Sequence, residues 1–143
     1  MDSPTGPPFQ PFLSQRAREG ASAAQVADLI DSVWQQIHAA MAPVIGQRGV
    51  AALYKRSLHL AAMTYPWLAA AQPTGGLAPM DLSLLRAEFA RRNGAEAAAA
   101  GAALLLSFHG LVDSLIGPSL SGTLLGEVWA KFFSGSPAQD PPP

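Results

Sequence analysis

Cysteine is absent from the 143 residues, so the chain has no disulfide framework, thiolate zinc site or thiol nucleophile. The acidic residues are scattered, and no two of them form the close pair that glycoside hydrolysis needs. The two-histidine spacing of a helical zinc site is missing as well. We therefore expect a protein without a metal, without a cofactor and without catalytic activity.

Charged residues are scarce. They make up 13% of the chain against 49% hydrophobic residues, which is about half of the usual charged share of a soluble domain. So little polar cover favours self-association or a protein partner, because apolar surface is left to be buried. The net charge of −1 gives no overall attraction for nucleic acid, and we expect no nucleic-acid partner.

Long hydrophobic runs are lacking too. The longest uncharged apolar run, residues 97–112, is shorter than the roughly 18 residues of a membrane-spanning helix. The first twenty residues have no apolar core of a secretory signal. We expect a cytoplasmic protein with no membrane span, and the alanine, glycine and proline bias is typical of a bacterial chain.

The patterning of the middle of the chain is helical. Apolar residues recur at intervals of three and four, and no β-branched alternation typical of strands occurs. Ser22 and Gln25 have the spacing of a capping box at the start of the first helix, and Pro43 is expected to end or bend it. Residues 1–20 and 134–143 are rich in proline, glycine and serine. The sequence predicts a single all-α domain, a bundle of about five helices over residues 21–133, between two disordered arms.

A short internal match suggests a repeat. The segment IHAAMAPVIG at residues 37–46 aligns without gaps on FHGLVDSLIG at residues 108–117, so that Gly46 falls on Gly117. A glycine that follows an isoleucine in this way suits a sharp corner after a helix, where any side chain would clash. We therefore predict two helix, corner, helix units around an approximate twofold axis, with the third helix as their connector.

The histidines of this match, His38 and His109, lie at the edge of the apolar stripe of their helices. A boundary histidine that packs its ring against the core is the favoured interpretation. The alternative is a phosphoacceptor role for His109, as in histidine phosphotransfer domains, which are also small helical bundles. The segment HGLVDSLIG departs from that pattern, since Val112 stands where a cation would pair with the phosphate and Asp113 would repel it.

The last helix, about residues 119–133, is apolar on more than one side. Such a helix must bury two faces or meet a partner, and aromatic residues are typical anchors of interfaces. We predict a partner-binding surface there, made by Leu125, Trp129, Phe132 and Phe133. The function predicted from this surface is that of a non-enzymatic helical adaptor or regulatory domain in bacterial signalling, which forms a homodimer or binds a protein partner.

A second candidate surface is basic. No acidic residue occurs between Asp31 and Asp81, and this stretch carries the candidate anion-binding residues Arg48, Lys55, Arg56 and His59. A sensor that binds a small anionic ligand there is one alternative function. A sensor for a small apolar ligand is another, because the alanine-rich stretch of residues 97–103 either packs helices closely or leaves room for a ligand.

Overall fold

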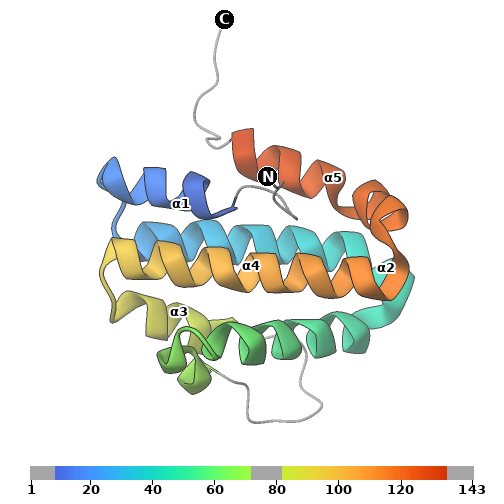
Figure 1. Cartoon of the computed structure of the whole chain (residues 1–143), viewed down its shortest axis with the longest axis horizontal. Helices are drawn as coiled ribbons and strands as arrows, with labels where there is room; N and C mark the ends of the chain where they lie inside the picture. The colour runs from blue at the N-terminus through green and yellow to red at the C-terminus, as the bar shows by residue number, and fades with distance from the viewer. Residues whose placement is uncertain (1–8, 72–81, 135–143) are drawn as a thin grey trace, which may run out of the picture.

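The structure is a computed structural model that describes residues 9–71 and 82–134. The described residues contain no strand, so the predicted all-α single-domain bundle is confirmed. The elements are α1 (Phe9–Arg18), α2 (Ala23–Ala62), the short 3-10 helix η1 (Pro66–Ala71), α3 (Ser83–Ala90), α4 (Gly94–Ile116) and α5 (Pro118–Ser134) (Figure 1).

Two glycines turn the chain in the same way. Gly46 interrupts α2 with φ 83° and ψ 160°, and Gly117 separates α4 from α5 with φ 88° and ψ 151°. Only glycine adopts this backbone conformation at little cost. Pro43 lies inside the helix and does not end it, so the break belongs to Gly46, and the two corners predicted from the repeat are confirmed. We call residues 23–45 and 47–62 the first and second segments of α2.

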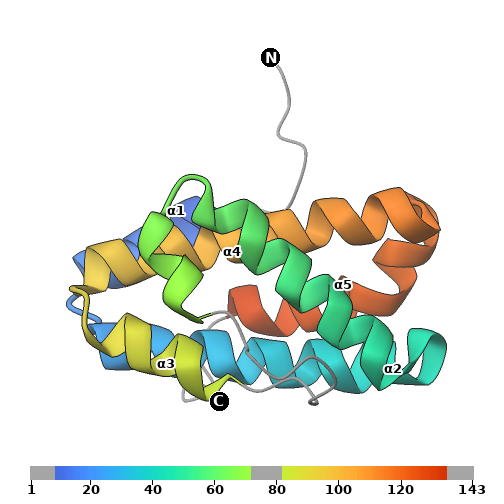
Figure 2. The ribbon, with the colours of Figure 1, turned by 90° about the horizontal axis from the view of Figure 1, so that it is seen from below.

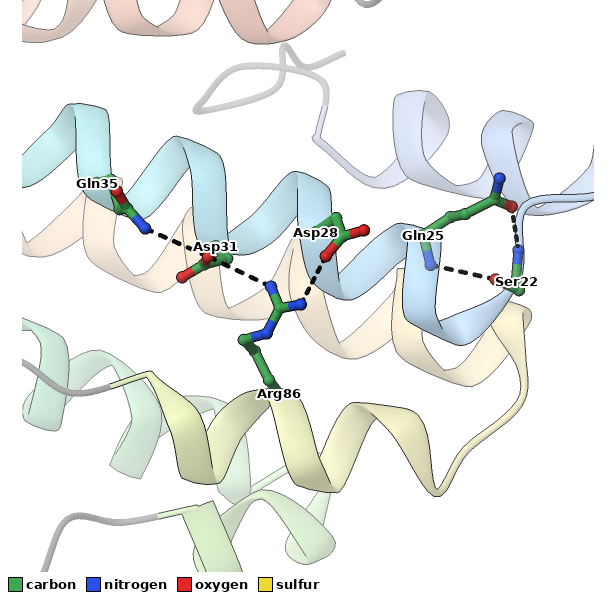
Figure 3. Close-up of polar contacts among 6 residues, drawn as sticks. All are labelled: Ser22, Gln25, Asp28, Asp31, Gln35 and Arg86. Atoms are coloured by element: carbon green, nitrogen blue, oxygen red, sulfur yellow. Dashed lines mark hydrogen bonds and ion pairs between the residues drawn. The ribbon is translucent and has the colours of Figure 1, made fainter.

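The helices that lead into these corners also begin alike. Ser22 caps α2 by accepting a 3.1 Å hydrogen bond from the backbone N–H of Gln25. Seventy-one positions later, Asn93 caps α4 by accepting a 2.8 Å bond from the N–H of Glu96. The Gln25 side chain also accepts a 2.8 Å bond from the Ser22 N–H, which completes the predicted capping box (Figure 3).

Burial follows the same interval of 71 residues. Every buried residue of α2 except Ala23 has a buried counterpart in α4 or α5. The pairs are Val26 and Ala97, Ala27 and Ala98, Ile30 and Gly101, Val33 and Leu104, Trp34 and Leu105, Ile37 and Phe108, Met41 and Val112, Val50 and Ser121, Tyr54 and Leu125, Ser57 and Val128, Leu58 and Trp129, and Ala61 and Phe132. The chain is therefore a tandem repeat in structure, although few of these pairs are identical in sequence.

The two repeat units exchange their leading helices. α1 precedes α2 in the chain but packs on α4, whereas α3 precedes α4 but packs on α2. The first segment of α2 lies beside α4 with both corners at one end of the molecule, and α5 and the second segment of α2 lie on opposite sides of this pair (Figures 1 and 2). α3 is thus the counterpart of α1, and the prediction that it merely connects the units is wrong.

The prediction of a disordered arm over residues 1–20 is wrong for Phe9–Arg18, which form α1. Phe9 and Leu13 are fully buried, so this helix is stabilised by packing that the composition of the arm does not reveal. The spacing of Phe9, Phe12 and Leu13 at i, i+3 and i+4 is the signal in the sequence that predicts it. Residues 1–8 and 135–143 of the predicted arms lie outside the described residues.

α4 is central to the bundle and strongly apolar. Within the described ranges it is the one helix with the length and hydropathy of a membrane span, and 39% of that window is buried inside the structure. Its buried residues contact α2 and α1, as the residues of a core helix do.

Candidate functional site

The residues predicted to bind a partner on α5 do not face solvent. Leu125 is fully buried, Trp129 and Phe132 are each 7% exposed, and Phe133 is half-buried. In the single folded chain these residues are therefore buried, and partner binding by them stays a prediction. For Trp129, Phe132 and Phe133 the physical reason is that aromatic rings of α1, which composition assigns to a disordered arm, pack against them. α5 also packs on α2 and α4.

Aromatic rings make the contact between α1 and α5. The ring centroid of Phe9 lies 5.0 Å from that of Trp129 in an edge-to-face arrangement and 5.5 Å from that of Phe133. Phe12 lies 4.9 Å from Phe132 and 5.4 Å from Phe133. Such pairs each add about 0.5–1.5 kcal/mol beyond the burial of their area. We call the surface of α4 and α5 beneath α1 the helix-binding groove.

Several polar side chains of α1 bond within the helix and its last turn. Gln10 donates to Ser14, and Gln15 donates to Glu19 while accepting from Arg18. Toward the groove, α1 presents the apolar side chains of Phe9, Phe12 and Leu13.

The repeat counterpart of α1, α3, is held differently. Arg86 on α3 donates to Asp28 at 2.6 Å and lies 3.3 Å from Asp31, both on α2 (Figure 3). The hydrogen bond to Asp28 is the main reason that the pKa of Arg86 is raised. An ionic fork thus adds to the burial of Leu85 and Phe89, whereas aromatic packing dominates at α1.

A tight turn joins α1 to α2. Gly20 has a positive φ of 103°. Its N–H donates to the Ala17 carbonyl, and the N–H of Ala21 donates to the Arg16 carbonyl. These two hydrogen bonds form the Schellman motif of a helix end. The Ala21 carbonyl lies so close to Gly94 that a Cβ there would come within 2.4 Å of its oxygen. The turn is therefore seated on the start of α4.

His109 lies at the edge of the groove. Its Nε2 is 3.4 Å from Asp113 Oδ2, its ring is 6.1 Å from that of Trp129, and its side chain is 15% exposed. His38 is half-buried too, as expected for boundary residues. A phosphoacceptor histidine needs an accessible nitrogen, and here Nε2 faces a carboxylate while Nδ1 is buried. This geometry does not favour the phosphotransfer alternative.

Several buried polar atoms near the second corner lack a hydrogen-bond partner among the described residues. They are His109 Nδ1, Asp113 Oδ1, Ser121 Oγ and Trp129 Nε1. Their counterparts in the first unit are His38, Ala42, Val50 and Leu58. The second unit therefore carries a polar cost at positions where the first unit is mostly apolar.

The predicted anion-binding residues lie together on the second segment of α2. Arg48, Arg56 and His59 are exposed and Lys55 is half-buried. The structure gives none of these four side chains an ion pair or hydrogen bond with any described residue. They form an open basic face, which we call the α2 basic face, rather than an enclosed pocket.

Other ligand sites find less support. Within residues 9–71 and 82–134, no group of three histidine or acidic residues is placed to hold a metal ion. Within the alanine-rich start of α4, a Cβ at Gly101 would lie 2.9 Å from Ile30 Cδ1, so there is no room for an apolar ligand beside Gly101. An open hollow of about 270 Å³ lies between α2 and α5 and is lined by Gln36, Ala39, Ala40, Glu127, Val128 and Lys131.

Comparison of the chain with family models, with curated proteins and with solved structures gave no match.

Proposed function

We propose that this protein is a non-enzymatic helical interaction module that self-associates, and that two copies pair by exchanging α1. In the pair, α1 of each copy fills the helix-binding groove of the other. The observation that supports this most directly is the burial of Phe9 and Leu13 of α1 against α4 and α5, which belong to the other repeat unit. A dimer of this kind would present every other surface twice, as suits an adaptor or regulatory domain.

Exchange preserves the contacts of the single chain. The rings of Phe9 and Phe12 would meet Trp129, Phe132 and Phe133 of the second copy in the same way as they meet those of their own chain. Domain swapping is a low-cost route to a dimer because no new interface has to be built. The repeat is already assembled in this manner, since each unit packs its leading helix on the other unit.

The turn after α1 is the hinge that exchange requires. It is short, from Glu19 to Ser22, and α1 makes few contacts with α2, the helix to which it is joined. Opening this turn releases α1 while the buried residues of α2 beyond the turn keep their contacts with α4. The low net charge of the chain also favours association, because two copies repel each other only weakly.

Site-directed cross-linking tests the exchange. The chain has no cysteine, so Phe12→Cys and Phe133→Cys each provide a unique thiol on one side of the α1–α5 contact. The two variants are unfolded together, refolded at high concentration and treated with a short bismaleimide. We expect a product of twice the chain mass that contains one copy of each variant.

A matched pair controls for random collisions. Ala24→Cys is exposed on α2 and replaces Phe12→Cys in the same mixture with Phe133→Cys. If both mixtures give equal yields of double-mass product, or if sedimentation finds only monomer at every concentration, the exchange is wrong. A double variant, Phe12→Cys with Phe133→Cys, refolded at high dilution should cross-link within one chain, which verifies that the groove has formed.

A further inference from the structure

We infer that the α2 basic face docks an acidic helical segment of a partner protein. This inference is independent of α1 exchange, because it concerns the opposite side of the bundle. Arg48, Lys55 and His59 are seven and four residues apart, so they lie along one side of the helix. By the 1.5 Å rise per residue this row is roughly 16 Å long, and Arg56 lies beside it.

The cations of this face stand apart from the other arginines of the bundle. Arg86 pairs with aspartates of α2, and Arg91 and Arg92 each lie 3.8 Å from Glu88. Arg48 and Arg56, in contrast, have no acidic partner among the described residues, and the chain has no acidic residue between Asp31 and Asp81. No carboxylate of residues 9–71 or 82–134 therefore neutralises their charge.

The repeat indicates that the fold does not require these cations. The α5 positions equivalent to Arg48, Lys55, Arg56 and His59 are Ser119, Gly126, Glu127 and Ala130. Both helices nevertheless bury the same set of positions against the core. Since α5 packs without a cation at any of these four positions, packing does not require the basic side chains of α2.

The surroundings of the α2 basic face favour an acidic helix as its partner over DNA or an anionic membrane. The second segment of α2 lies on the outside of the bundle (Figure 2). Met63, 74% exposed, follows His59 by four residues at one end of the row, and Val44, 51% exposed, lies just before the Gly46 corner at the other end. An acidic amphipathic helix supplies both carboxylates for the row and apolar groups for its ends. Three full charges are few beside the 6–10 phosphate contacts of a typical DNA-binding protein, and each adds only about 1 kcal/mol at an anionic membrane.

Fluorescence anisotropy with the full chain tests this inference. The probe is a labelled helical peptide with glutamates at positions i, i+4, i+7 and i+11, and the comparison peptide has the same composition with the glutamates spread around the helix. We expect the aligned peptide to bind at least about tenfold more tightly, and the binding to weaken as salt is raised. Replacing both arginines, as Arg48→Gln with Arg56→Gln, should weaken it by about tenfold or more.

A charge-matched variant separates local from global charge. Ser119→Glu with Ala130→Glu lowers the net charge by the same amount, but on the equivalent face of α5. We expect this control to bind the aligned peptide as the unaltered chain does. Equal weakening by both variants, or equal binding of the two peptides, would overturn the inference. Binding to phosphatidylserine vesicles or to duplex DNA but not to the aligned peptide would overturn it as well.

Discussion

Ile30 and Gly101 occupy equivalent positions in the two repeat units and lie against each other where α2 crosses α4. A Cβ at residue 101 would be 2.9 Å from Ile30 Cδ1 and 3.1 Å from Ile30 Cγ1. A residue that meets its own counterpart marks the axis of an approximate twofold. The two helices approach closely at this point because one member of the pair has no side chain.

This contact predicts that Gly101→Ala lowers stability although alanine favours helices. The gain in helix propensity is about 0.5–1 kcal/mol, whereas overpacking a core typically costs about 1–3 kcal/mol. Ile30→Val removes only Cδ1, the nearest atom, and should relieve the crowding. In urea unfolding we expect the cost of Gly101→Ala to be smaller by about 1 kcal/mol in the Ile30→Val background. Strictly additive effects would show that the contact is not tight.

The two corner glycines make a second prediction, that Gly46→Ala and Gly117→Ala each destabilise the fold. Both residues have positive φ and ψ near 155°, where a residue with a side chain pays about 1–3 kcal/mol. Nothing lies within 4 Å of a Cβ at either position, so the cost comes from the backbone alone. Thermal unfolding of the two variants measures it.

Helical glycines provide the control for the corner variants. A Cβ at Gly110 or Gly122 also has nothing within 4 Å, but both residues lie inside helices. Gly110→Ala and Gly122→Ala should therefore raise stability by about 0.5–1 kcal/mol. If all four variants change the melting temperature in the same direction, the corners do not depend on their backbone conformation.

The sequence predicted the local features of this fold better than its packing. The capping box of Ser22, the corners at Gly46 and Gly117 and the helical class all follow from residue types at short spacing, and the structure confirms them. The pairing of Phe9 with Trp129 does not, because it joins residues at opposite ends of the chain. The ring contacts of Phe9 and Phe12 with α5 place Trp129, Phe132 and Phe133 in the core of the folded chain, and nothing in the pattern of α5 says which helix covers these residues.

A third prediction concerns the fork between Arg86 and the aspartates of α2. Arg86→Gln should lower the melting temperature in low salt, and the difference should shrink in 1 M salt because all three side chains are partly exposed and screened. The pKa of Arg86 is raised by its hydrogen bond to Asp28. A group with a raised pKa contributes fully below its unfolded value, so Arg86 itself adds no pH dependence between pH 5 and pH 9. A salt-independent loss would contradict this account.

The fourth prediction is that Asp113→Ala stabilises the protein at pH 8 by about 1 kcal/mol. Asp113 lies in the last turn of α4, where a negative charge is unfavourable. Its Oδ1 is buried without a hydrogen-bond partner among the described residues, so removing the carboxylate removes an unpaired buried polar atom.

The repeat supplies the reciprocal test, because position 42, the counterpart of Asp113, is alanine. Ala42→Asp places a carboxylate one turn from His38 in the first unit. We expect this variant to lower the stability of the protein at pH 8 by about as much as Asp113→Ala raises it. The two variants exchange the same residue types between equivalent sites. A gain in stability from Asp113→Ala together with a loss from Ala42→Asp would show that a carboxylate is unfavourable at this position of either unit. If Asp113→Ala instead destabilises the fold, a bond to Asp113, such as one through an ordered water, must satisfy Oδ1, and the second corner is better stabilised than its side-chain contacts indicate.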